Sequence, residues 1–119
     1  MARLMSSTEL HQRIEKGEDF VLIDVLGNDD FSQEHIPGAL NMPLSELRQR
    51  AKKDLSKNQR IVVYGKDHDE ESSNEAATML EELGFRKVAD FDGGLMAWKK
   101  AGFLTEGEQP ETLGEMAEL

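Results

Sequence analysis

The chain has 119 residues, the length of one domain, and its 38% hydrophobic content is sufficient for a core of its own. With 24 acidic and 14 basic residues the net charge is -10, which opposes binding to nucleic acid or to an anionic membrane surface. The absence of cysteine excludes disulfides, thiolate zinc sites, iron–sulfur clusters and thiol nucleophiles.

The amino-terminal residues 1–5 run directly into polar residues, without the pattern of a signal peptide. No apolar stretch approaches the ~20 residues that a membrane span requires. We therefore expect a cytoplasmic protein that has neither a membrane nor a nucleic-acid partner.

The first half of the chain alternates helical and extended patterns. A helix is predicted at 7–16, started by the capping-box pair Ser6 and Glu9 and ended by Gly17. The apolar run 20–25 is typical of a strand buried on both faces. The segments that follow are a loop at 27–30, a Pro37-Gly38 turn, a short strand at 39–42 and a helix at 45–54.

The centre of the chain is a strand, a polar loop and a helix in direct succession. Residues 61–64 are β-branched or aromatic and predict a buried strand, and a helix then runs to Gly84. Ser72 and Glu75 have capping-box spacing, so Ser72 or Ser73 is expected to cap that helix. Between a strand's carboxyl end and a helix's amino end, backbone N–H groups collect and suit an anion or a nucleophile. The candidate site residues are Gly65, Lys66, Asp67, His68, Asp69, Glu70, Glu71, Ser72 and Ser73.

The last part of the chain adds one further strand and helix. A strand is predicted at 87–91, and a helix starts at the Gly93-Gly94 turn and ends near Gly102. The tail 105–119 carries five glutamates and no basic residue, and its spacing allows one short helix. Alternation of strands and helices predicts an α/β fold with a central parallel sheet of about five short strands and helices on both faces.

Three blocks of the sequence resemble the rhodanese family, the single-domain sulfurtransferases, over residues 6 to 104. The first joins Asp24 to the turn at 35–39, the second is the strand 61–64 with the helix after it, and the third is 92–94 with Trp98. The resemblance implies a rhodanese-like domain at 1–104, followed by the acidic tail at 105–119. Its signature residues in this chain are Asp24, His35, Pro37, Gly38, Gly93, Gly94 and Trp98.

The signature residues also have simple structural explanations. Pro37 and Gly38 make a rigid turn, beside which His35 is expected to bond to nearby backbone. Gly93-Gly94 is a tight strand-to-helix turn, and Trp98 is expected to lie in the core.

The chain departs from the family pattern where sulfur chemistry takes place. At the position of the family's sulfur-accepting cysteine, this chain has Gly65. Glu70 stands where some relatives have a second cysteine, and Leu26 stands where the Asp-Val-Arg segment has its arginine. Persulfide chemistry needs a thiolate, which no other residue type replaces. The loop carries one positive charge, on Lys66, and four carboxylates, so its net charge is -3, which disfavours binding of the thiosulfate anion. We also hypothesise a positive φ at Gly65, which would strain any side chain there.

The leading hypothesis is a domain that has lost catalysis and serves as a binding or regulatory module, with no catalytic residue, no cofactor and no metal, and with a protein partner that the sequence does not identify. One alternative is sulfur transfer with a cysteine supplied by a partner. Another is a metal- or ligand-sensing module on the acidic loop 66–71, whose carboxylates and His68 are oxygen and nitrogen ligands. A serine nucleophile with His68 as its base is the least favoured, since helix capping explains both serines.

Overall fold

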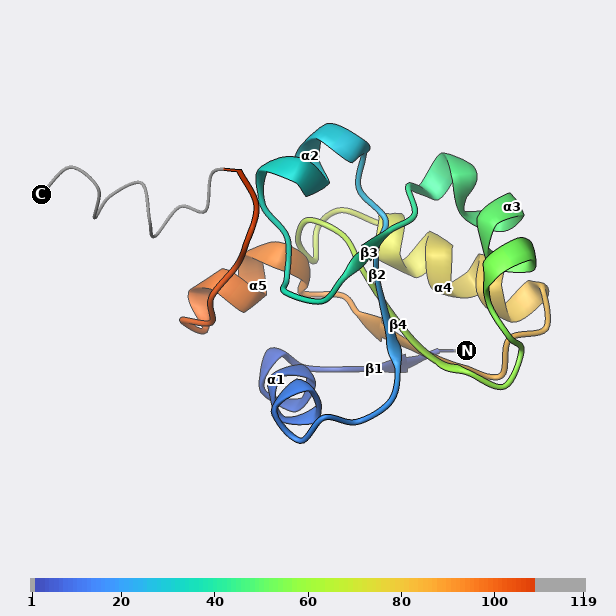
Figure 1. Cartoon of the computed structure of the whole chain (residues 1–119), viewed down its shortest axis with the longest axis horizontal. Coiled ribbons are helices and arrows are strands. Elements are labelled where there is room, and N and C mark those ends of the chain that lie inside the picture. The colour runs from blue at the N-terminus through green and yellow to red at the C-terminus, as the bar shows by residue number, and fades with distance from the viewer. Residues whose placement is uncertain (1, 109–119) are drawn as a thin grey trace, which may run out of the picture.

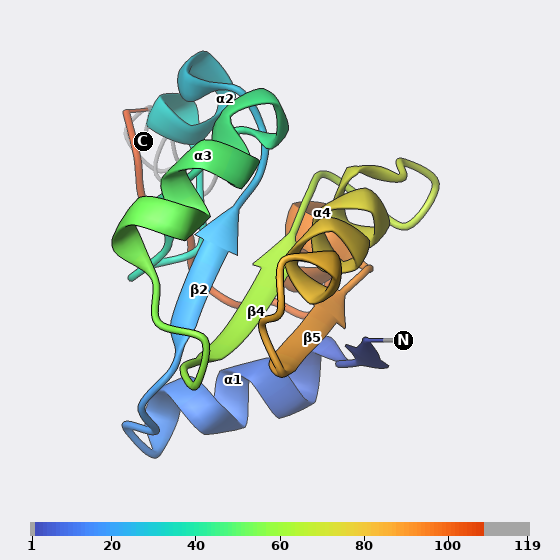
Figure 2. The same cartoon turned by 90° about the vertical axis from the view of Figure 1, so that its right-hand side faces the viewer.

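A five-stranded parallel sheet forms the centre of the molecule in this computed structural model, which describes residues 2–108. The strand order is β1-β5-β4-β2-β3 (Figures 1 and 2). The strands are β1 (Arg3–Leu4), β2 (Val21–Asp24), β3 (Leu40–Asn41), β4 (Arg60–Tyr64) and β5 (Lys87–Phe91). All neighbouring strands pair in parallel, and β4 is the central strand. The predicted α/β fold is therefore confirmed.

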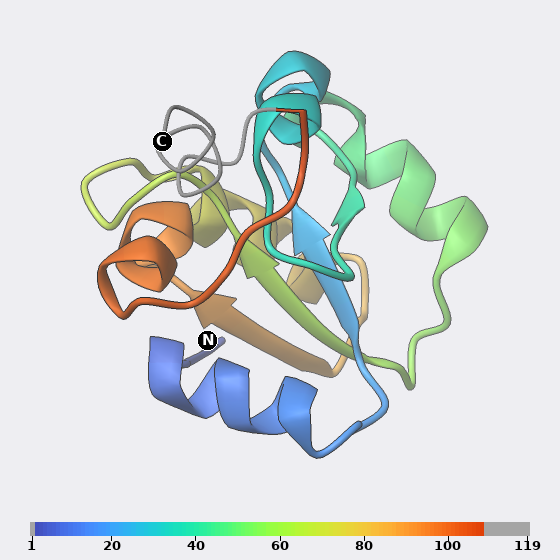
Figure 3. The same cartoon turned by 60° about the vertical axis from the view of Figure 1, so that its left-hand side comes forward.

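Helices cover both faces of this sheet. They are α1 (Ser7–Glu15), α2 (Asn28–Gln33), α3 (Leu44–Asp54), α4 (Ser72–Glu82) and α5 (Gly94–Lys100). Helices α3 and α4 pack on one face, and α1 and α5 pack on the other (Figures 2 and 3). Helix α2 follows the carboxyl end of β2.

The side chains of β4 show why the central strand lacks polar residues. Ile61 and Val63 join the core under α3 and α4, whereas Val62 and Tyr64 join the core under α1 and α5. All four are at most 3% exposed. Alternate residues of a strand point to opposite faces, so a strand covered on both faces is apolar throughout.

Two elements differ from the sequence-based expectations. Residues 27–30 do not form a loop, because α2 begins at Asn28 after Gly27 with extended backbone. Asp29 and Asp30 lie in its first turn, where negative charge is favourable. Strand β1 has no counterpart among the predicted elements, since its two residues are exposed and lack a pattern.

The expected start of α1 is confirmed: the Glu9 N–H donates to the Ser6 hydroxyl, 3.1 Å away. At the other end of the chain, Glu106 forms an antiparallel bridge with His35, and the Glu108 N–H donates to the Ser32 carbonyl. The short helix predicted near residues 113–117 lies outside the described residues. None of the described helices has both the length and the apolar character that crossing a membrane requires.

Candidate functional site

The loop 65–71 lies over the carboxyl end of β4, beside the first turn of α5 (Figure 3). The N–H of Leu95 donates to the Gly65 carbonyl at 3.0 Å, and the N–H of Met96 donates to the Lys66 carbonyl at 2.9 Å. These two bonds fix the beginning of the loop through backbone atoms alone. The placement expected from the sequence is confirmed.

The loop folds one of its own carboxylates toward the amino end of α4. Glu70 Oε2 accepts from the Ser72 N–H at 3.0 Å, and Oε1 accepts from the Ser72 hydroxyl at 2.5 Å and more weakly from the Lys66 N–H at 3.5 Å. Asp67 supports this arrangement, because its Oδ1 accepts from the N–H groups of Asp69 and Glu70. An internal anion therefore takes the helix-terminal position that would suit an external one.

The space at Gly65 is filled by the same two side chains. A Cβ atom built on Gly65 would lie 2.5 Å from the Ser72 Oγ and 2.7 Å from the Glu70 Oε1. Gly65 is not among the glycines with positive φ, so the hypothesis of a left-handed conformation is wrong. Crowding disfavours a side chain at this position, and backbone strain does not.

The two serines do not cap α4 as the sequence suggested. The N-cap residue is Glu71, which makes no side-chain cap bond, and Ser72 is the first residue of the helix. Ser72 and Ser73 are both buried, Ser72 donating to Glu70 and Ser73 hydrogen-bonding to Asp90. Glu70 thus accepts the first helix N–H, that of Ser72, in their place, a role that capping-box spacing did not reveal.

The other chemistries considered for the loop find no matching geometry. His68 is 73% exposed and pairs with Asp69 at 3.3 Å, while the Ser72 hydroxyl is bonded to Glu70 and not to a histidine. Within residues 2–108, no group of three or more His, Asp or Glu side chains is placed to hold a metal ion.

Two buried carboxyl groups stand near the same edge of the sheet, on opposite faces. Asp24, at the end of β2, accepts from the Leu26 N–H at 2.8 Å, which offsets part of the rise in its pKa caused by burial.

Asp90, the second of these carboxyl groups, is 2% exposed under α4. Burial raises the pKa of Asp90, and the Ser73 hydroxyl opposes that rise. Asp90 Oδ1 makes no hydrogen bond to any described residue. In the sequence, Asp90 is one residue of the predicted strand at 87–91 and was not expected to be a site residue.

His35 lies just before the Pro37-Gly38 turn and contacts Phe31 and Glu106. Its Nδ1 is 2.7 Å from the Phe31 carbonyl, its ring stacks on the Phe31 ring, and its Nε2 is 3.3 Å from Glu106 Oε1. Gly38 has φ of +88°, as the tight turn requires. The backbone bond expected of His35 is therefore present, together with a carboxylate contact that was not expected.

Of the carboxyl-terminal signature, only the glycine turn touches the loop. Gly94 has φ of +66°, and a Cβ there would lie 2.6 Å from the Gly65 carbonyl oxygen. Gly93 keeps a helical φ of -64°. Trp98 is 3% exposed in the core, as predicted, and its Nε1–H donates to the Leu104 carbonyl.

Comparison with known proteins gives a consistent family assignment. The profile of the Rhodanese-like domain matches residues 6–101. A thiosulfate sulfurtransferase from Coxiella burnetii is 31% identical over 99 residues, which are 83% of this chain and 89% of that protein. An HTH-type transcriptional regulator from Mycobacterium tuberculosis is 31% identical over 93% of this chain, which spans about half (48%) of the regulator's length. The crystal structure of an Anabaena protein superposes with a TM-score of 0.81 at 38% identity, covering 87% of this chain and 91% of that one.

Proposed function

The chain belongs to the rhodanese-like domain family, and we propose that within it this domain is a non-catalytic binding or regulatory module. One observation carries the proposal: the position of the family's sulfur acceptor is a glycine whose side-chain space is filled by Ser72 and Glu70. With no cysteine anywhere in the chain, no thiolate is available to take up sulfur.

The electrostatics of the loop support the same proposal. A substrate such as thiosulfate needs N–H donors at the amino end of α4, and the Glu70 carboxylate accepts the Ser72 N–H. A second negative charge at ~4 Å from that carboxylate costs about 4 kcal/mol at an effective dielectric of 20. Loss of the sulfur acceptor and occupation of the anion site by Glu70 thus both disfavour sulfur transfer from thiosulfate.

The outer side of the loop is suited to a basic partner surface. The Asp69 side chain is 86% exposed, and Glu71 is exposed at the start of α4. Among the curated relatives, one is named a transcriptional regulator and contains the matching region as about half of its length. That architecture supports a role as a recognition module, in which the loop contacts lysine or arginine side chains of a protein partner.

The first experiment is a sulfurtransferase assay with thiosulfate and cyanide. Purified protein is expected to form no thiocyanate above a no-protein control. Turnover that persists through further purification and follows the protein peak would overturn the proposal.

The second experiment tests recognition by the loop. Partner proteins captured by the wild-type domain should be lost with Asp69→Lys plus Glu71→Lys and retained with Glu46→Lys plus Asp54→Lys, an equal charge change on α3. If both double variants captured the same partners, the loop would not be the binding surface.

A further inference from the structure

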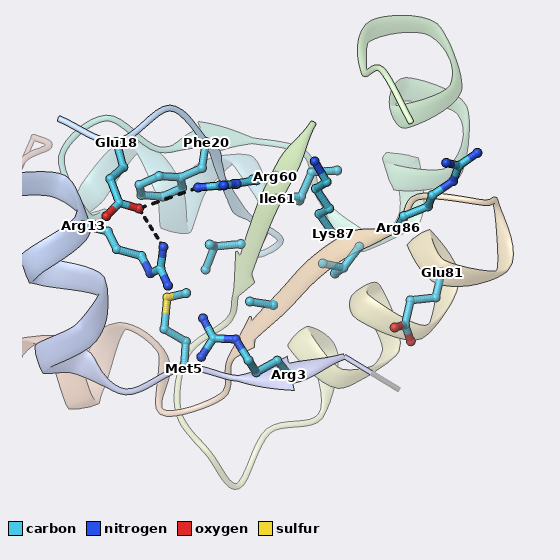
Figure 4. A pocket seen from close by; sticks show the side chains of 13 residues that line it. Arg3, Met5, Arg13, Glu18, Phe20, Arg60, Ile61, Glu81, Arg86 and Lys87 are labelled. Carbon is cyan, nitrogen blue, oxygen red and sulfur yellow. Dashed lines mark hydrogen bonds and ion pairs between the residues drawn. The ribbon is translucent and has the colours of Figure 1, made fainter. Parts of the chain in front are cut away.

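A separate cavity of about 430 Å³ opens at the amino end of the sheet, at the edge opposite the loop (Figure 4). Five cationic side chains line it: Arg3, Arg13, Arg60, Arg86 and Lys87. They come from β1, α1, β4, the residue before β5 and the first residue of β5, so the fold brings them together from distant parts of the chain. Two carboxylates, Glu18 and Glu81, line it as well, so the lining has a net charge of +3 in a chain whose net charge is -10.

The two cations nearest α1 are already neutralised. Arg3 and Arg13 both pair with Glu9, at 2.7 and 2.9 Å, and Arg13 also contacts Glu18 at 2.6 Å. Arg3, Arg13 and Glu18 thus form one charge-paired wall of the cavity. That leaves Arg60, Lys87 and Arg86, and because Arg86 points away from the other two in Figure 4, Arg60 and Lys87 are the charges that a ligand would meet.

Arg60 and Lys87 are direct cross-strand partners in the register of β4 and β5. Like charges opposite each other on neighbouring strands destabilise a sheet. Arg60 reaches Glu18 only at 4.0 Å and is 59% exposed, and across residues 2–108 no carboxylate pairs with Lys87. An anion between the two side chains would remove their repulsion, and a guanidinium beside an ammonium is a typical phosphate-binding pair.

The cavity also has an apolar wall beside these charges. Met5 and Phe20 line it on the side of α1, and the labelled side chains in Figure 4 show the Phe20 ring near Arg60. A second hollow of about 500 Å³ adjoins it and shares Phe20, Arg60 and Lys87. Both volumes lie in the range of small-molecule sites, which combine apolar walls with a few placed polar groups.

We propose that this cavity binds a phosphate monoester with an aromatic body, the phosphate held by Arg60 and Lys87 and the ring lying against Phe20. The site is independent of the loop 65–71 and of the function proposed for it. Ligand occupancy here would leave that loop free for a partner on the opposite edge of the sheet.

The test is a titration with phenyl phosphate, followed by amide NMR of the full chain. Saturable shifts are expected at residues 60–62 and 87–89 and not at 65–71. Inorganic phosphate should bind the same residues more weakly, and phenol should produce no saturable shifts there. Shifts confined to 65–71, or no saturation with phenyl phosphate, would overturn the proposal.

Matched variants distinguish binding in this cavity from a general effect of the protein's charge. Arg60→Gln with Lys87→Gln should weaken phenyl phosphate binding at least tenfold, whereas Arg48→Gln with Lys52→Gln, an equal charge change on exposed residues of α3, should leave it unchanged. Phe20→Leu should weaken phenyl phosphate but not inorganic phosphate. Equal losses in the two charge variants would refute the assignment. The exposed positions leave the fold intact, and the unfolding temperature of each variant checks this.

Discussion

Returning a cysteine to position 65 should not by itself restore sulfur transfer. In the Gly65→Cys variant the new Cβ would stand 2.5 Å from the Ser72 Oγ and 2.7 Å from the Glu70 Oε1. Contacts below 3.0 Å do not persist, so these side chains must move. Movement breaks the bonds that Glu70 accepts from the Ser72 hydroxyl and N–H.

The cost of that movement follows from the bonds that are lost. Hydrogen bonds to a charged acceptor each contribute roughly 1.5 to 3 kcal/mol, and partial exposure of Glu70 places these two near the lower limit. Gly65→Cys should therefore lower the free energy of unfolding by about 2 to 3 kcal/mol. For a chain of this length that is a fall in unfolding temperature of about 10 °C.

Removing the Glu70 carboxylate should relieve part of the crowding, since the Ser72 Oγ remains, and should remove the repulsion of substrate. Gly65→Cys with Glu70→Ala is expected to unfold at about the same temperature as Gly65→Cys alone, because both variants lack the bonds to Glu70. Its thiolate should take one sulfur atom from thiosulfate with release of sulfite, measured by intact-protein mass spectrometry. Gly65→Cys with Glu71→Ala is the matched control. It has the same net charge, but Glu71 is exposed and makes no side-chain cap bond.

The assays read both consequences: thiocyanate formation for transfer and thermal unfolding for stability. The two double variants should differ, because one removes the side chain that fills the site and the other removes only a nearby charge. Robust turnover by the Gly65→Cys single variant would refute the reasoning, as it would show that the loop accommodates a thiol and an anion together. Equal behaviour of the double variants would assign the effect to net charge alone.

Three further outcomes are expected. Gly94→Ala should lower the free energy of unfolding, measured by urea denaturation, by about 2 to 5 kcal/mol. The control Gly102→Ala is also at positive φ but in open space, and should lower it by only about 1 to 2 kcal/mol. Equal effects of the two variants would contradict the close contact of Gly94 with Gly65. Tyr64→Phe removes the hydroxyl that accepts from the buried Ile36 N–H and should cost about 1 to 3 kcal/mol by the same measurement, an unchanged midpoint being the contrary result. Burial raises the pKa of Asp90, so the folded chain holds a proton where the unfolded chain has lost it, and this contribution to stability falls as pH rises through the raised pKa. Asp90→Asn should therefore gain in unfolding temperature relative to wild type as pH rises above about 4, the ordinary pKa of an aspartate, and a difference independent of pH would count against it.

The strands and most helices were predictable because burial on both sheet faces produces apolar runs that the sequence displays directly. The run 61–64 and the Gly93-Gly94 turn are examples. Helix α2 was missed since its first residues, Asn28 to Asp30, are also typical of loops. Strand β1 was missed because two exposed residues have no periodicity to detect.

The site was predictable in position but not in its contacts. The loop's place follows from a strand that leads into a helix, which the residue pattern shows. The direction of the Glu70 side chain depends on the loop backbone and on bonds from Ser72 and Lys66, and sequence spacing gives no measure of these. Likewise, the cross-strand pairing of Arg60 with Lys87 depends on a register that only the assembled sheet defines.

The two backbone hydrogen bonds from α5 to Gly65 and Lys66 make this domain a display scaffold. They hold one end of the loop without using any loop side chain, and the buried first turn of α4 holds the other end. Foreign residues can therefore be exchanged for His68 and Asp69, while Asp67 and Glu70 keep the hydrogen bonds at the amino end of α4. Because the chain contains no thiol, one cysteine introduced into such an insert would be its single site for maleimide labelling or surface immobilisation.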